Sequence, residues 1–93
     1  MSYYAVLLPL VDQEKSNLVR PAHLEFLDGM KQAGHVSAFG RFTDGSGGLV
    51  IFNAETYEDC EALVQKDPYV ESGARNYEIH EWGLLWADLK SDS

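Results

Sequence analysis

His23 is the residue of this sequence that is best placed to carry out acid–base chemistry. It lies in RPAHLEFLDGM, residues 20–30, a segment whose apolar side chains recur at helical spacing. On a helical wheel with about 100° between successive residues, His23 falls between Met30 and Leu27, inside the apolar arc. We therefore expect the imidazole to face the core or a cavity. It is either a structural histidine, hydrogen-bonded to a backbone carbonyl or water, or a general base or acid, because imidazole titrates nearest neutral pH.

Asp67 is the candidate for the carboxylate that would orient such a histidine. It opens the segment Asp67-Pro68-Tyr69, directly after the second predicted helix. At that position its charge meets the negative end of the helix dipole and gains no stability there, which suggests another use. The alternative is ordinary Asp-Pro turn chemistry. Because both predicted helices pack side by side on one sheet, His23 and Asp67 could meet in space and form a catalytic dyad.

Two arginines and two hydroxyl side chains are candidates for binding a substrate. Arg20, one turn before the histidine, or Arg41 could stabilise an anion that develops on the substrate. Ser37 and Tyr69 are weaker candidates for polar contacts, and Tyr69 has the alternative of a packed aromatic after a helix. The chain has a formal net charge of −8. Even so, Arg20, Arg41 and Arg75 could focus positive charge in one place.

Charge and spacing argue against several other functions. An acidic chain without a basic stripe is a poor partner for nucleic acid or for an anionic membrane surface. No run approaches the roughly 18 apolar residues that a membrane helix needs. The sequence lacks His-x-x-x-His and His-x-His spacings, so we expect no metal. The glycines of TDGSGG, residues 43–48, are read as turn residues because no helix follows to cradle a phosphate, and we expect no cofactor.

Cys60 is the only cysteine of the chain. An internal disulfide is therefore impossible, and a reducing, cytoplasmic setting fits best. Cys60 falls on the apolar stripe of the second predicted helix, so we expect a core residue rather than a nucleophile. The two other histidines, His35 and His80, are taken as structural.

The predicted elements follow the order strand, helix, strand, strand, helix, strand. The strands are expected at residues 3–10, 35–42, 48–53 and 76–82, and the helices from residue 17 or 19 to 33 and from 56 to about 66. This order predicts an α+β, ferredoxin-like βαββαβ fold with a four-stranded antiparallel sheet, formed as a single domain by residues 1–93. The first and third strands are apolar on both faces, which is typical of the central strands of such a sheet.

The second face of this sheet needs a cover. Both helices of the predicted fold pack on one face, and the apolar side chains of the other face would otherwise be left in water. A second copy of the chain, packed sheet against sheet, is the economical solution, so we expect a homodimer. GLLWADL, residues 83–89, could extend the last strand across the partner, with Trp82 and Trp86 as anchors.

The chain resembles the YciI-like proteins of the dimeric α+β barrel superfamily. The resemblance rests on Arg20-Pro-Ala-His-Leu24 and the helix after it, on Gly34, on the glycine-rich hairpin and on Asp67-Pro-Tyr69. It implies a sheet-to-sheet dimer and a catalytic dyad that maps onto His23 and Asp67. The chain departs from the family pattern at Gly40-Arg41, where many relatives have Gly-Pro. Superfamily neighbours include muconolactone isomerases and a dehydrochlorinase of hydroxyquinone rings, whereas most YciI-like proteins have no assigned reaction.

These observations leave three functions open. The first is a small-molecule enzyme of the isomerase or lyase (dehydrochlorinase-like) class, in which the histidine moves a proton and the aspartate orients it. The second is a non-catalytic dimeric module that binds a small metabolite and uses His23 only as a hydrogen-bonding group. The third, a cofactor-free oxygenase, is marked by nothing in the sequence.

Overall fold

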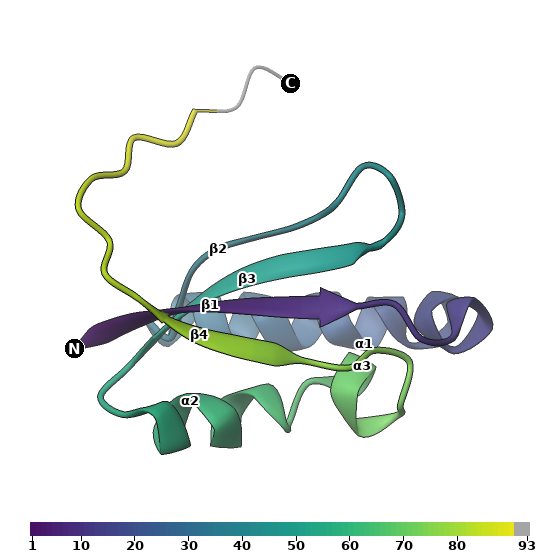
Figure 1. Cartoon of the computed structure of the whole chain (residues 1–93). Helices are drawn as coiled ribbons and strands as arrows, with labels where there is room; N and C mark the ends of the chain where they lie inside the picture. The colour runs from purple at the N-terminus through teal and green to yellow at the C-terminus, as the bar shows by residue number, and fades with distance from the viewer. Residues whose placement is uncertain (91–93) are drawn as a thin grey trace.

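The computed structural model describes residues 1–90 and confirms the α+β fold (Figure 1). Four antiparallel strands form one sheet in the order β2-β3-β1-β4, so that the first and third strands are central, as predicted. The elements are, in chain order, β1 Ser2–Pro9, α1 Gln13–Gln32, β2 Val36–Arg41, β3 Gly47–Ala54, α2 Tyr57–Val64, α3 Pro68–Glu71 and β4 Glu78–Trp82.

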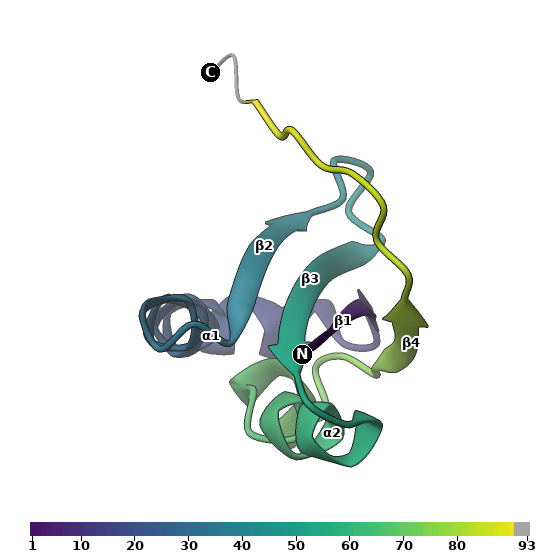
Figure 2. The same cartoon turned by 90° about the vertical axis from the view of Figure 1, so that its left-hand side faces the viewer.

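The helices all cover one face of the sheet (Figure 2). Alternate residues of β1 and β3 point toward them, because side chains of a strand alternate between its two faces. Burial of this apolar surface makes the largest favourable contribution to the stability of the fold. The core residues that lie between the sheet and the helices are Tyr4, Val6, Leu8, Val50 and Phe52 from the strands and Leu27, Cys60 and Val64 from the helices.

Helix α1 begins earlier than the sequence pattern predicted. The start was expected at residue 17 or 19, with Pro21 in the first turn, but the helix begins at Gln13. The prediction missed the cap: the Asp12 carboxylate accepts a hydrogen bond from the backbone amide of Lys15 at 3.1 Å. Pro21 therefore lies inside the helix and cannot donate to the preceding turn. The additional turns of the helix include Ser16, which is buried.

The sequence pattern placed Asp67 at the end of the second helix, which is wrong. Helix α2 ends at Val64, and Asp67 is instead the N-cap of the short helix α3. Its Oδ1 accepts a hydrogen bond from the Tyr69 amide at 2.9 Å, and Pro68 occupies the first helical position, where its missing N–H costs nothing. The carboxylate thus accepts a hydrogen bond from the amide two residues on, which is the Asp-Pro turn chemistry stated as the alternative, and it caps α3.

The β2–β3 hairpin makes close contacts at two glycines, at Gly47 with β1 and at Gly48 with β2 and Arg75. Gly47 has a φ of +153°, and a Cβ built there would collide with the backbone carbonyl oxygen of Leu8. A Cβ on Gly48 would lie 2.9 Å from the carbonyl oxygen of Gly40 and 3.4 Å from Nη1 of Arg75. Glycine at these positions lets the hairpin close over the end of β1 and leaves space for the arginine side chain.

The other face of the sheet has no helix on it (Figure 2). The side chains there are largely apolar and include Tyr3, Ala5, Leu7, Leu49 and Ile51. In the single chain, residues 83–90 form neither helix nor strand and run away from the sheet (Figure 1). The expected extension of the last strand across a partner stays a prediction. Leu85 is 99% exposed and Trp86 76%. Across residues 1–90, no helix is long and apolar enough to cross a membrane.

Candidate functional site

The structure brings His23 and Asp67 into contact on the helix side of the sheet. Nδ1 of His23 lies 2.8 Å from Oδ1 and 3.0 Å from Oδ2 of Asp67. Helix α1 supplies the histidine and the N-cap of α3 supplies the aspartate. His23 is 7% exposed and Asp67 1%, so little water competes for the contact, and a charge-assisted hydrogen bond is strongest in such surroundings.

The geometry of the carboxylate fixes which ring nitrogen is free. A carboxylate only accepts hydrogen bonds, so the proton of the contact is on Nδ1, and in the neutral ring Nε2 then carries the lone pair. Nε2 has no hydrogen-bond partner among the described side chains. Within residues 1–90, Nε of Arg75 is the only side-chain nitrogen or oxygen that is both fully buried and without a partner. The unpartnered Nε2 of His23 is therefore not fully buried. Nε2 of His23 therefore keeps access to the pocket that the ring lines.

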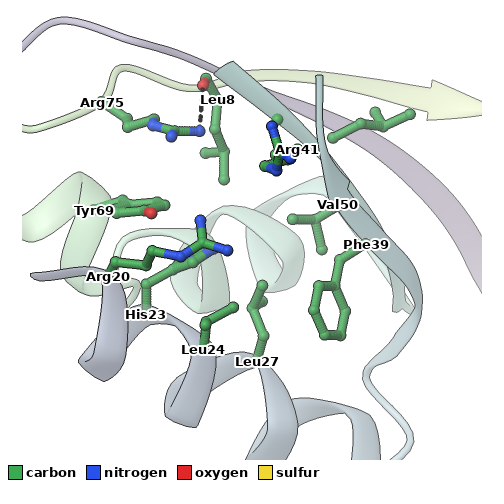
Figure 3. Close-up of a pocket in the computed structure, with 13 residues that line it drawn as sticks. Leu8, Arg20, His23, Leu24, Leu27, Phe39, Arg41, Val50, Tyr69 and Arg75 are labelled. Atoms are coloured by element: carbon green, nitrogen blue, oxygen red, sulfur yellow. Dashed lines mark hydrogen bonds between the residues drawn. The ribbon is translucent and has the colours of Figure 1, made fainter. Parts of the chain in front are cut away.

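Tyr69 stacks on the histidine and holds its orientation. The ring centroids of His23 and Tyr69 are 3.8 Å apart with 20° between the ring planes. The guanidinium of Arg75 lies 4.3 Å from the centroid of Tyr69, and for steric reasons it occupies the opposite face of that ring (Figure 3). Tyr69 is 2% exposed. The packed aromatic expected as the alternative for Tyr69 is thus observed, in direct contact with His23.

A pocket of about 130 Å³ opens beside this stack, between α1 and the helix side of the sheet. Its size is close to that of an apolar cavity of about 150 Å³ that accommodates benzene. The pocket therefore suits a compound with one six-membered ring. Its apolar lining consists of Leu8, Leu24, Leu27, Phe39, Leu49 and Val50, and its polar lining of Arg20, His23, Arg41, Tyr69 and Arg75 (Figure 3).

The predicted binding residues are divided between the pocket and its surroundings. Arg20 and Arg41 line it from α1 and the end of β2, and Tyr69 lines it from α3. Ser37 does not line the pocket, and its hydroxyl instead donates to Oδ1 of Asn53 at 2.8 Å. Strict alternation along β2 would place Ser37 on the same face as Arg41, but a bulge between Val36 and Ala38 breaks this alternation.

Arg75 lines the pocket as well and was not assigned to the site from the sequence. It follows α3 in a segment whose only regular pairing is an isolated bridge to Leu10. No periodicity marks such a position. The single signal was the suggestion that three arginines gather in one place, and in the structure Arg20, Arg41 and Arg75 do line one pocket.

The remaining reactive side chains lie elsewhere. Cys60 is fully buried in the core, and burial, with a smaller effect of Glu61, raises the pKa of its thiol to about 11. The thiolate, which is the nucleophilic form, is therefore scarce at neutral pH. His35 and His80 are exposed and do not line the pocket. In the part of the chain that the structure describes, no three His, Cys, Asp or Glu side chains gather as ligands for a metal.

Comparison with known proteins agrees with this architecture. A family model described as the YCII-related domain matches residues 2–83. The chain belongs to the YCII-related family. This confirms the family that the resemblance indicated, and the match spans every helix and strand described above.

This YCII-related protein is similar to a curated protein in sequence and to a solved structure in fold. It is 34% identical over 82 residues to the "Uncharacterized protein YjpA" of Bacillus subtilis (strain 168), over 87% of this chain and 96% of the relative. Its fold is similar to that of 5-chloro-2-hydroxyhydroquinone dehydrochlorinase (TftG) from Burkholderia phenoliruptrix AC1100, solved in complex with 2,5-dihydroxybenzoquinone. The TM-score is 0.74 at 17% identity, over 86% of this chain and 92% of TftG, so this likeness concerns the fold.

Proposed function

We propose that the protein is a small-molecule enzyme of the isomerase or lyase class, in which His23 and Asp67 carry out general acid–base chemistry without a metal or other cofactor. The observation that carries the proposal is the contact of Nδ1 with both oxygens of Asp67 at 2.8 and 3.0 Å. It leaves Nε2 of a buried ring free at a pocket of the size of one six-membered ring. The fold shared with TftG, a dehydrochlorinase that binds a dihydroxyquinone, supports a cyclic or phenolic substrate.

In the proposed reaction, Nε2 of His23 takes a proton from the substrate. The electron pair of the broken bond moves onto the substrate and forms an enolate-like anion, while Asp67 stabilises the imidazolium. The guanidinium of Arg20 or Arg41, both of which line the pocket, stabilises the anion. In an isomerase the histidine returns the proton to another atom of the substrate. In a lyase the anion instead expels a leaving group, and the proton is released to water.

The second candidate is a non-catalytic module that binds a small metabolite. It is favoured by the hydrogen bond from the Tyr69 amide to Asp67, because a carboxylate that caps a helix has a structural reason to be there. In such a module His23 would serve only as a hydrogen-bonding group in the pocket.

The His23→Gln variant separates the two candidates. Ligands are first found by thermal-shift screening of monocyclic phenols and quinones, including 2,5-dihydroxybenzoquinone, and each ligand is then tested for conversion. An enzyme is expected to convert at least one ligand, and His23→Gln to bind that ligand within about tenfold of the wild-type Kd and lose turnover, because glutamine offers polar atoms but no titratable nitrogen. Bound ligands that wild-type protein never converts would favour the module.

We also propose a homodimer in which the uncovered sheet faces pack together. The apolar side chains of that face and the exposed residues of the segment 83–90 support it. Light scattering at micromolar concentration is expected to give twice the chain mass of 10.4 kDa. Replacing Leu85, Trp86 and Leu89 together by serine is expected to weaken the dimer, whereas Leu18→Ser, which changes an equally exposed residue on α1, is the control. A monomer mass for the wild type would contradict the dimer.

The proposal includes no nucleic acid and no membrane as partner. The net charge of −8 supports this, since a phosphate backbone or an anionic lipid surface would repel the chain. The single, buried thiol is compatible with the reducing, cytoplasmic setting that we expect.

A further inference from the structure

Arg75 is a buried cation without an anionic partner. The residue is 9% exposed. Nη1 donates to the carbonyl oxygen of Leu8 at 3.4 Å and Nη2 to the hydroxyl of Ser16 at 3.3 Å, and both acceptors are neutral. Nε has no hydrogen-bond partner. No carboxylate of residues 1–90 lies within ion-pair distance of this guanidinium.

These contacts compensate the charge only in part. Removing an ion from water costs several kcal/mol unless an opposite charge and hydrogen bonds replace the lost hydration. A guanidinium has five N–H donors, of which two have acceptors here, and both hydrogen bonds are long. The ring of Tyr69 contributes a cation–π contact at 4.3 Å, but a π face carries no net charge. The described side chains therefore leave most of this positive charge uncompensated.

The guanidiniums of Arg20 and Arg41 line the same pocket as Arg75. Arg20, Arg41 and Arg75 line the 130 Å³ pocket of His23 and also a neighbouring pocket of about 150 Å³. No aspartate or glutamate is among the lining residues of either pocket. Figure 3 shows the three guanidiniums around the pocket, with Arg75 on the opposite side of Tyr69 from His23. A protein of net charge −8 thus has a pocket whose wall is positively charged.

We propose that this pocket selects a monocyclic carboxylate: the carboxylate binds to Arg75 with Arg20 and Arg41 beside it, and the ring lies against the apolar wall. The inference deepens the proposed function and rests on it for one part, namely that the edge of the ring away from the carboxylate faces His23. A carboxylate suits Arg75 because it supplies the missing negative charge and can accept two parallel N–H···O bonds from a planar guanidinium. These bonds come from the Nη groups, since Nε is fully buried. Leu24, Leu27 and Phe39 supply the apolar contact for the ring.

A purely structural role of Arg75 is the competing explanation. The side chain does join β1 to α1 through Leu8 and Ser16. Such a link requires only a neutral donor, however, and explains neither a buried positive charge without an anionic partner nor the convergence of two more arginines. The two explanations make different predictions for ligand binding, because a structural arginine confers no preference for charge.

The test compares 4-hydroxybenzoate with 4-hydroxybenzamide, which have similar size and differ in charge. Dissociation constants are measured by NMR titration of the isotope-labelled full chain. We expect the carboxylate to bind wild-type protein at least about tenfold more tightly than the amide, and the Nε–H resonance of Arg75 to shift with the carboxylate only. Arg75→Met is expected to abolish the preference, whereas Lys31→Met, which removes an exposed positive charge of α1 outside both pockets, is expected to retain it.

Equal affinity of wild-type protein for the two compounds would overturn the proposal, and this comparison needs no variant that might fail to fold. A preference that survives in Arg75→Met would overturn the role of Arg75. The outcome is independent of catalysis: His23→Gln is expected to keep the preference for the carboxylate even if it abolishes turnover. Failure of the anion site and failure of the acid–base mechanism therefore give different results.

Discussion

Replacing Asp67 with asparagine is expected to lower kcat by about 10²–10⁴-fold for any compound that the wild-type protein converts. The Tyr69 amide holds Oδ1 of Asp67 at 2.9 Å, so the capping oxygen of an asparagine stays in place. Its NH₂ group then occupies the position of Oδ2, which lies 3.0 Å from Nδ1 of His23. Nδ1 of His23 then faces a donor at this position and an acceptor at the position of Oδ1, 2.8 Å away, so the preference for a proton on Nδ1 is lost. The charge that stabilises the imidazolium is lost as well. In a Ser-His-Asp triad the same change lowers kcat by about 10⁴-fold.

The controls for this prediction concern the fold. Asparagine caps helices as well as aspartate does, so Asp67→Asn is expected to lower the free energy of unfolding by only about 1–3 kcal/mol, the contribution of a hydrogen bond to a charged group. Asp12→Asn makes the same change at the cap of α1, where the carboxylate contacts the Lys15 amide, and is expected to leave kcat unchanged. An Asp67→Asn protein that is folded and as active as the wild type would contradict the mechanism.

Replacing Tyr69 with alanine is expected to lower the free energy of unfolding by about 3–5 kcal/mol. The ring is 2% exposed and packs between His23 and Arg75. Its removal leaves a cavity in the core and withdraws the cation–π contact from a buried guanidinium. A loss of this size is a large fraction of the roughly 5–15 kcal/mol that typically stabilises a small domain.

Tyr69→Phe is the matched variant. It keeps the stack and removes only the hydroxyl, which forms no hydrogen bond within residues 1–90. We expect a change of less than about 1 kcal/mol in urea-induced unfolding. If the hydroxyl also takes no part in catalysis, turnover is retained, which would assign Tyr69 to positioning rather than to substrate contact. A Tyr69→Ala protein as stable as the wild type would contradict the packing role.

The features that could be predicted from the sequence are those with strong periodicity. Two strands that are apolar on both faces indicated which strands are central, and the strand order β2-β3-β1-β4 confirms this. Similarly, the helical wheel placed His23 toward the core, where it is found. Both predictions concern the partition of side chains between water and the interior, and the burial of apolar surface is the strongest driving force of folding.

The features that were missed depend on single hydrogen bonds or on tertiary contacts. The cap at Asp12 and the separate short helix that begins after Asp67 each depend on one hydrogen bond between a carboxylate and a backbone amide. The bulge at Ser37 adds one residue to β2, so that strict alternation no longer gives the faces of the residues on its two sides. Arg75 lies in an irregular segment, and its burial results from contacts with Leu8, Ser16 and Tyr69 that are distant in sequence or lie in another element.

The position of the proton on the His23 ring decides whether the proposed base exists. Nitrogen-15 NMR of the labelled protein, recorded at the pH at which turnover is measured, distinguishes Nδ1 from Nε2 and shows which of them is bonded to hydrogen. We predict a proton on Nδ1, shared with Asp67, and a bare Nε2, with the pattern reversed or lost in Asp67→Asn. A wild-type ring with its proton on Nε2 would contradict the mechanism, because no base would then face the pocket.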